Sequence, residues 1–220
     1  MNLEEFKNIL NSGNYDNMKP FIRMEVRNKA NLGPNAYYNN IIGDITSVVT
    51  FQTILDDNRQ VSAVATNTLI NSLGSSVVEL LNDAKLNTPC NFKICRLYDI
   101  VEYKILNKTK SLSYNTLDSI DTLIDSNNPF DSIIVVSIDT NTRVSILQFP
   151  KLLRHIYGKI GDYYIVPSSV YEVFIIPKNK LPDIHQMNEI IHQVNRTSVK
   201  PCDVLSNKLL KYNALGLSEC

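Results

Sequence analysis

The chain contains, at residues 163–177, the sequence Tyr-Tyr-Ile-Val-Pro-Ser-Ser-Val-Tyr-Glu-Val-Phe-Ile-Ile-Pro. β-Branched and aromatic residues fill both ends of this segment, which predicts two short strands. Pro167 separates them because proline cannot donate to a strand ladder. In the second strand alternate residues point to opposite faces, and both faces are mainly apolar. We therefore expect this strand to lie inside a sheet that is covered on both sides, and the rest of the fold to form around it.

The composition is that of a globular protein. The chain has 220 residues, of which 44% are hydrophobic and 20% are charged, enough for one large or two small domains. Lys plus Arg and Asp plus Glu number 22 each, so no net charge favours nucleic acid or an anionic membrane as a partner. No segment approaches the roughly 20 apolar residues that a membrane span needs. The N-terminus has Glu4 and Glu5 where a signal peptide has basic residues.

The cysteine content agrees with a reducing compartment. Four cysteines in a chain of this length fit free thiols better than a disulfide framework. They are Cys90, Cys95, Cys202 and Cys220. We therefore expect a cytoplasmic protein with four reduced thiols.

The hydrophobic pattern divides the chain into four segments. Two of them contain a β-hairpin followed by an amphipathic helix, and the segment between these two is rich in Ser, Thr, Asn and Asp. The expected segments are an N-terminal helix and strand (1–43), a first hairpin-helix unit (44–106), a polar connector (107–131) and a second hairpin-helix unit with the strand pair (132–220). This order predicts an α+β fold in which mainly antiparallel sheets are covered by helices.

The two units share a weak internal repeat. The first hairpin is predicted at 48–65, and the second at 133–147 with its turn at 139–142. At a constant offset of 83 residues, without gaps, Asp56-Asp57-Asn58 aligns with Asp139-Thr140-Asn141 and Leu69-Ile70 with Leu152-Leu153. Either an internal duplication or the chance recurrence of a common hairpin-helix pattern explains this similarity.

The N-terminal segment also contains a short alternating run at residues 21–27. The apolar members, Ile22, Met24 and Val26, are predicted to point inward. The charged members, Arg23, Glu25 and Arg27, are predicted to point outward. The run indicates a half-buried strand, although a helix is not excluded.

One helix brings candidate metal ligands together. His185, Glu189 and His192 are spaced to lie on one helical face, where two imidazoles and a carboxylate resemble a zinc site. That face is opposite the apolar residues Met187, Ile190, Ile191 and Val194, and the spacing is not the His-Glu-x-x-His pattern of metalloproteases. The pattern therefore favours a solvated helix surface, and we expect no metal and no cofactor.

Four polar residues near the strand pair are the candidate binding residues: Ser168, Ser169, Glu172 and Asn195. In a structural interpretation, the two Ser hydroxyls bind local backbone amides and hold the Glu172 carboxylate. In a functional interpretation, the four residues line a cleft between the two units, and the pKa of Glu172 is perturbed. The sequence contains no Gly-x-Ser-x-Gly elbow and no Gly-rich phosphate loop, so no catalytic residue is assigned.

Several short motifs follow one another in the order found in a known family. They are the segment at 164–173, Val194-Asn195-Arg196-Thr197, Val204-Leu205-Ser206-Asn207 and Tyr212, with Asp44, Thr66-Asn67 and the segment at 84–89 upstream. The chain resembles, over about residues 40–213, an uncharacterised bacterial domain-of-unknown-function family found mainly in anaerobic Gram-positive bacteria and their mobile elements. The resemblance implies an N-terminally shortened member, and it implies no established reaction, cofactor or partner.

Two classes of function remain. The first is a cytoplasmic, non-catalytic protein-interaction module, carried by a phage or another mobile element, whose partner is another protein. Ordinary surfaces form such interfaces and leave little trace in the sequence. The second is an enzyme or a small-ligand-binding protein that uses a cleft between the two units. Neither class involves nucleic acid or a membrane.

Overall fold

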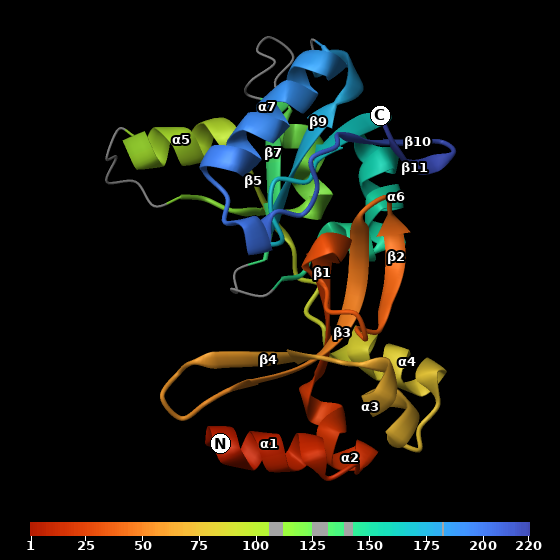
Figure 1. Ribbon diagram of the computed structural model, residues 1–220. Coiled ribbons are helices and arrows are strands. Elements are labelled where there is room, and N and C mark those ends of the chain that lie inside the picture. Colours follow the sequence, from red (N-terminus) through yellow and green to blue (C-terminus); the bar gives the residue numbers. More distant parts are fainter. Residues whose placement is uncertain (106–111, 125–131, 139–142, 182) are drawn as a thin grey trace.

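The computed structural model describes residues 1–105, 112–124, 132–138, 143–181 and 183–220 (Figure 1). The described residues form a four-stranded sheet and a seven-stranded sheet, and every pair of neighbouring strands is antiparallel. Helices pack against both sheets. The predicted α+β class with mainly antiparallel sheets is confirmed.

The elements within the described residues have the following bounds. The α-helices are α1 (Leu3–Asn11), α2 (Tyr15–Met18), α3 (Asn67–Ser72), α4 (Val77–Asn87), α5 (Leu97–Ile105), α6 (Pro150–Ile160) and α7 (Ile184–Thr197). The strands are β1 (Ile22–Asn28), β2 (Tyr38–Ile42), β3 (Ile45–Ile54), β4 (Gln60–Val64), β5 (Lys93–Arg96), β6 (Asn115–Thr116), β7 (Ile134–Ser137), β8 (Tyr163–Val166), β9 (Glu172–Pro177), β10 (Leu210–Asn213) and β11 (Gly216–Glu219). Short 3₁₀ helices include η1 (Lys19–Phe21), η3 (Leu117–Leu123), η5 (Ile146–Gln148) and η7 (Pro201–Asp203).

The N-terminal sheet is built on β3, a ten-residue strand. Strand β1 pairs with β3 from Ile22 opposite Phe51 to Asn28 opposite Ile45. On its other side, β3 pairs with β2 through its first residues and with β4 through its last ones. Apolar residues on one face of this sheet pack against α1, α2, α3 and α4 in a core that includes Phe6, Met18, Ile22, Phe51 and Leu80. This layer forms the lower half of the molecule in Figure 1.

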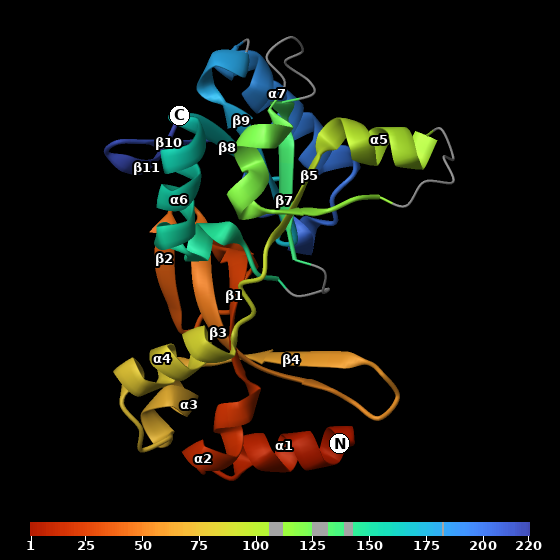
Figure 2. The same cartoon turned by 180° about the vertical axis from the view of Figure 1, so that it is seen from behind.

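The C-terminal sheet has the strand order β11-β10-β8-β9-β7-β5-β6. Strand β9 pairs with β8 on one side and with β7 on the other, so the predicted strand pair and its inner position are confirmed. Val173 and Ile175 of β9 point into the largest core, which α6 covers on the side facing the viewer in Figure 2. Phe174 and Ile176 point to the opposite face, which α7 covers. Both faces of β9 are apolar because both are covered.

The prediction of the second hairpin is wrong for its second strand, at residues 143–147. Residues 143–147 form no strand, and Ile146–Gln148 is the 3₁₀ helix η5. The carbonyl of Arg143 instead accepts a hydrogen bond from the backbone amide of Val26 in β1, at 2.7 Å. The predicted turn at 139–142 lies outside the described residues. A backbone bond to the other half of the molecule therefore replaces the local pairing that the alternating pattern predicted.

Two strands pair across the predicted segment limits. Strand β1, from the segment 1–43, pairs with β3 of the first unit. Strand β5, from the segment 44–106, pairs with β7 and so belongs to the C-terminal sheet. The residues that follow β5 form helix α5.

One hydrogen bond links the helices of the lower layer. The Tyr15 hydroxyl of α2 donates to Oδ2 of Asp83 in α4 at 2.5 Å, and both residues are buried. The Lys19 ammonium lies 3.2 Å from the same oxygen. The bond from Tyr15, followed by Lys19, holds the pKa of Asp83 below its ordinary value of 3.8.

We expect Tyr15→Phe to lower the free energy of unfolding by about 1–3 kcal/mol at neutral pH, because it leaves the buried Asp83 carboxylate short of a donor. A depressed pKa stabilises the fold above the ordinary value of 3.8, and this contribution disappears as the pH falls through the folded-state pKa. The loss in the variant should therefore shrink in strong acid. Urea unfolding at neutral pH and at about pH 3 measures both values, and an equal loss at both would contradict the assignment.

Candidate functional site

Two of the four predicted binding residues, Ser168 and Asn195, lie in an apolar groove of about 280 Å³. Helix α7 forms one wall, strands β8 and β9 contribute the floor, and Leu97 at the start of α5 marks the other side. The apolar lining residues are Leu97, Ile133, Val166, Phe174, Ile176, Met187, Ile190, Ile191 and Val194. We call this feature the α5–α7 groove. Its lining contains no charged residue.

The polar residues of the groove also have structural partners. Nδ2 of Asn195 donates to the carbonyl of Ser206 at 2.9 Å and to Oδ1 of Asn207 at 3.0 Å. Asn195 thereby ties α7 to the segment that leads into β10. Ser169 does not line the groove; its Oγ accepts a bond from the Tyr171 amide at 3.2 Å, which stabilises the break before β9.

Glu172 lies outside the groove, at the start of β9 and opposite Ser137 of β7. The expected latch between its carboxylate and the Ser168 or Ser169 hydroxyl is not formed, since only the Glu172 backbone carbonyl accepts a bond, from the Ser169 amide at 3.3 Å. Among the described residues the carboxylate forms no hydrogen bond and no ion pair. Burial raises its pKa above the ordinary value of 4.5, and Lys104 of α5 offsets part of this increase.

Glu172→Gln should leave stability at neutral pH unchanged or increase it. An acid whose pKa is raised on folding binds its proton more tightly when folded, so the fold loses stability as the pH rises above 4.5 through the folded-state pKa. Glutamine removes that loss, and the variant should depend less on pH in this range. Thermal unfolding over a pH series measures the effect. A decrease of about 1 kcal/mol or more at neutral pH would show that the carboxylate accepts hydrogen bonds in the fold.

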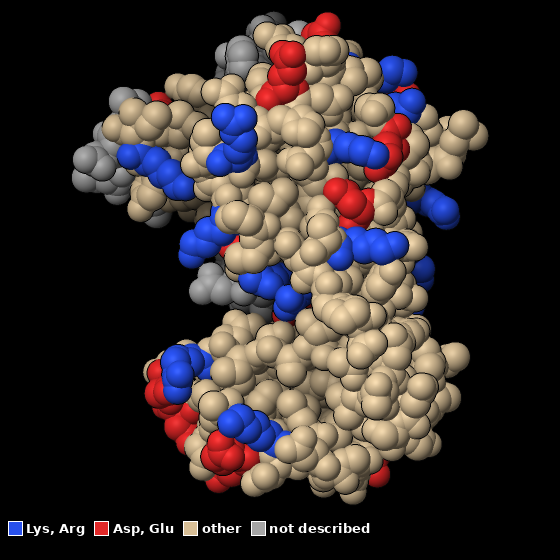
Figure 3. All heavy atoms as spheres, viewed as in Figure 1, with Lys and Arg blue, Asp and Glu red and all other residues tan. Residues whose placement is uncertain are grey.

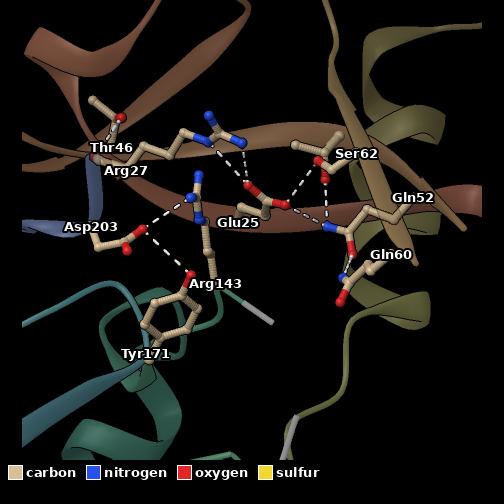
Figure 4. A network of polar contacts seen from close by, with 10 residues as sticks. Glu25, Arg27, Thr46, Gln52, Gln60, Ser62, Arg143, Tyr171 and Asp203 are labelled. Carbon is tan, nitrogen blue, oxygen red and sulfur yellow. Dashed lines mark hydrogen bonds and ion pairs between the residues drawn. The ribbon is translucent and has the colours of Figure 1, made fainter. Parts of the chain in front are cut away.

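A second polar site surrounds Glu25 of β1, which is only 3% exposed (Figure 4). Nε and Nη2 of Arg27 donate to its Oε2 at 3.0 and 2.7 Å. Nε2 of Gln52 and Oγ of Ser62 donate to its Oε1 at 2.9 and 3.0 Å. These donors come from β1, β3 and β4, so every strand around the carboxylate contributes to its solvation.

An ion pair of the C-terminal half, between Arg143 and Asp203, lies next to the Glu25 network. In Figure 4 the Arg143 side chain lies between Glu25 and Asp203. Nη2 of Arg143 is 3.0 Å from Oδ1 of Asp203 in η7, and the Tyr171 hydroxyl donates to the same oxygen at 3.4 Å. The sequence placed Glu25 on an outward face, which is wrong, because residues of the other half cover that face in the folded chain.

The Glu25 carboxylate has a structural role, because it joins side chains of three strands by hydrogen bonds. We call this network the Glu25 junction. A glutamate 3.0 Å from a serine hydroxyl has the distance of a base and a nucleophile. However, Arg27 and Gln52 also donate to this carboxylate, so both of its oxygens already accept structural hydrogen bonds. Ser62 therefore serves as one more donor to a buried charge.

Glu25→Gln should lower the free energy of unfolding by about 3 kcal/mol, because it leaves the partly buried Arg27 guanidinium without its counter-ion. Ser62→Ala, which removes one donor out of four, is the matched comparison and should cost about 1 kcal/mol. Chemical denaturation of both variants measures the difference. Similar small losses in the two variants would contradict the view that Glu25 is the centre of the junction.

The remaining sequence candidates do not come together as a metal site. Nδ1 of His185 lies 3.5 Å from Oε1 of Glu189 on the exposed face of α7. Within the described parts of the chain, no group of three or more His, Cys, Asp or Glu side chains is placed to hold a metal ion. The four cysteines are free, and burial raises the pKa of the Cys95 thiol to about 11, so that it is unreactive at neutral pH. None of the described helices is long and apolar enough to cross a membrane.

Comparisons with known proteins give one match. No match was found among the curated proteins or among the solved structures. The model of a family of unknown function, DUF5688, matches residues 3–214, which is nearly the whole sequence. This range includes the four-stranded sheet, all of the seven-stranded sheet except β11, the Glu25 network and the α5–α7 groove. The chain therefore belongs to the DUF5688 family of unknown function.

Proposed function

We propose that the protein is a non-catalytic interaction module that binds an amphipathic helix of another protein in the α5–α7 groove. The observation that carries this proposal is the apolar character of the groove and of both helices beside it. Aside from Ser168 and Asn195, its lining offers no side chain that would hydrogen-bond or orient a polar substrate. Sites for small substrates combine apolar walls with several convergent polar groups, and this groove lacks that combination.

Helix α5 is the clearest sign of a missing partner. It has nine residues and buries none of them. Tyr98, Val101 and Ile105, at positions i, i+3 and i+7, are 47%, 43% and 72% exposed. A helix this short is marginal in water without packing, and in Figure 1 it projects from the body of the molecule. A bound partner would cover this apolar stripe and stabilise the helix.

Helix α7 presents a similar surface on the other side of the groove. Ile190 and Val194 line the groove and remain 45% and 39% exposed, although the neighbouring Ile191 is buried. Isolated exposed apolar residues are common on proteins, but apolar residues on two adjacent helices beside an apolar groove indicate an interaction surface. Helix α7 supplies one wall, Leu97 at the start of α5 lies on the other side, and the sheet supplies the floor.

The shape of the groove favours a helix over an extended strand as the occupant. Strand β9 is paired on both sides, and β5 is paired with both β7 and β6. The floor therefore offers no free strand edge in the described residues to which a peptide could add. An amphipathic helix, in contrast, needs only a trough for residues spaced i, i+3, i+4 and i+7. Met187, Ile190, Ile191 and Val194 have the same spacing on α7, which suits packing of one helix against another.

We also propose that this interaction takes place in the cytoplasm of a bacterium, with the gene on a mobile element. The four free thiols support a reducing compartment. The bacterial and mobile-element origin is supported only by the resemblance of the sequence motifs.

Ile190→Glu tests the proposal, because it places a charge in the groove at a position that is already half exposed. We expect little change in melting temperature and loss of partner binding. Gln193→Glu adds the same charge on an exposed position of α7 that does not line the groove, and it should bind the partner like the wild type. Affinity capture from extracts of the native cells, followed by mass spectrometry, identifies proteins that bind the wild type and Gln193→Glu but not Ile190→Glu.

A synthetic peptide covering the predicted amphipathic helix of such a protein then completes the test. It should bind the purified protein and protect α5 and α7 from hydrogen exchange. Sedimentation of the purified protein alone addresses the other occupant, a second copy of the chain. A stable dimer that Ile190→Glu dissociates would overturn the proposal, as would a captured protein that binds both variants equally.

A further inference from the structure

A second and larger cleft, of about 610 Å³, lies beside β1 and against the β3–β4 hairpin. Figure 3 shows the surface indented above this hairpin. The cleft is separate from the α5–α7 groove, and none of the four predicted binding residues lines it. Its lining contains Arg23 and no Asp or Glu. We call it the Arg23 cleft.

Arg23 is held in place but has no counter-ion. Its Nη1 donates to the carbonyls of Pro20 and Ile22, both at 2.7 Å. These two bonds fix the guanidinium and leave Nε and Nη2 without a partner among the described residues. No described carboxylate forms an ion pair with it, whereas Arg27 and Arg143 pair with Glu25 and Asp203.

The lack of a counter-ion is energetically unfavourable at the position of Arg23. The side chain is partly buried, and burial lowers the pKa of its guanidinium. A partly buried cation without a nearby anion is poorly solvated, and an anionic ligand would restore the missing interactions through bidentate bonds. The described lining of the cleft has only this one cation. A singly charged carboxylate therefore fits it better than a doubly charged phosphate.

The amide side chains of the cleft have a defined orientation. The Glu25 carboxylate can only accept, so the NH₂ group of Gln52 faces it and Oε1 of Gln52 faces away. That oxygen accepts from Nε2 of Gln60 at 3.3 Å, which leaves Oε1 of Gln60 as an acceptor. Nδ2 of Asn87 donates to the Lys19 carbonyl at 2.9 Å, which likewise leaves Oδ1 of Asn87 as an acceptor.

The cleft thus combines one cation, two amide acceptors and apolar surface. The apolar part comes from Phe21, Met24, Ile54, Pro89 and Val144. We propose that the Arg23 cleft binds the C-terminal carboxylate of a short peptide or peptide-like molecule. The carboxylate pairs with Arg23, backbone N–H groups donate to Gln60 and Asn87, and an apolar side chain packs on the remaining surface.

The test compares a free acid with its amide. The probes are acetyl-Ala-Ala-Leu with a free C-terminal carboxylate and the same peptide as the C-terminal amide. The wild type should bind the acid at least about tenfold more tightly than the amide, a difference of about 1.4 kcal/mol. Arg23→Met should remove this preference, and Arg23→Lys should retain only part of it. Binding is followed by NMR titration up to millimolar peptide.

Arg59→Met is the matched control, because Arg59 lies in the turn of the β3–β4 hairpin beside the cleft, is exposed and is paired with Asp57. It should bind the acid like the wild type. Ile190→Glu should do the same, so that failure of the helix-binding proposal and failure of this one are distinguishable. Thermal unfolding confirms that each variant is folded before titration.

Four outcomes of the peptide and phosphate titrations would overturn the inference. They are no binding of the acid up to millimolar concentration, equal binding of acid and amide, unchanged binding by folded Arg23→Met, and tighter binding of inorganic phosphate than of the peptide acid. Octanoate is a carboxylate without peptide N–H groups, so it tests whether these groups contribute to binding. If octanoate binds as tightly as the peptide acid, the N–H donors contribute nothing and the peptide assignment is wrong.

Discussion

The burial of the Glu25 carboxylate is the constraint on which the joining of the two halves depends. A charge removed from water must be solvated by the protein, and here Arg27, Gln52 and Ser62 supply that solvation from three strands. Only a paired sheet brings these donors to one point. Once the carboxylate is satisfied, the polar face of the N-terminal sheet can be covered by the other half of the chain without leaving an unpaired charge.

The contacts around this junction are mostly polar and directional. The Val26 amide donates to the Arg143 carbonyl, Nε2 of Gln148 donates to Ser47 at 3.0 Å, and Nδ2 of Asn28 donates to the Leu205 carbonyl at 3.0 Å. Such bonds specify how the two sheets meet, because each buried donor must find its own acceptor. Val26 and Ile45 of the N-terminal sheet also belong to the core of the C-terminal sheet. The two halves therefore share one interior.

The two proposed binding surfaces differ in polarity because they lie in different parts of the fold. The α5–α7 groove lies on the outer face of the C-terminal sheet, where an apolar sheet face meets a helix that only partly covers it. The Arg23 cleft lies beside the Glu25 junction, where Arg23 is the one arginine of β1 without a carboxylate among the described residues. An apolar groove selects by shape and burial, whereas a cleft with one cation selects by charge.

Local patterns in the sequence determined the elements whose side chains repeat at a regular spacing. The strand pair at 163–177 followed from two apolar runs broken at Pro167, and the helix after Pro182 followed from apolar residues at helical spacing. The α+β class followed from the order of these elements. The same local reasoning placed Ser168 and Asn195 among the binding candidates, although it gave no reason for the apolar groove in which they lie.

Tertiary structure alone decided the features that depend on long-range contacts. The alternating pattern of residues 21–27 left Glu25 facing solvent, because the covering residues are far away in the sequence. The pattern at 143–147 predicted a strand, but the bond from Val26 and the helix η5 took its place. Exposure of α5 could not be predicted either, since its apolar residues resemble those of a buried helix. Periodicity reports which side chains share a face, and only packing determines what covers that face.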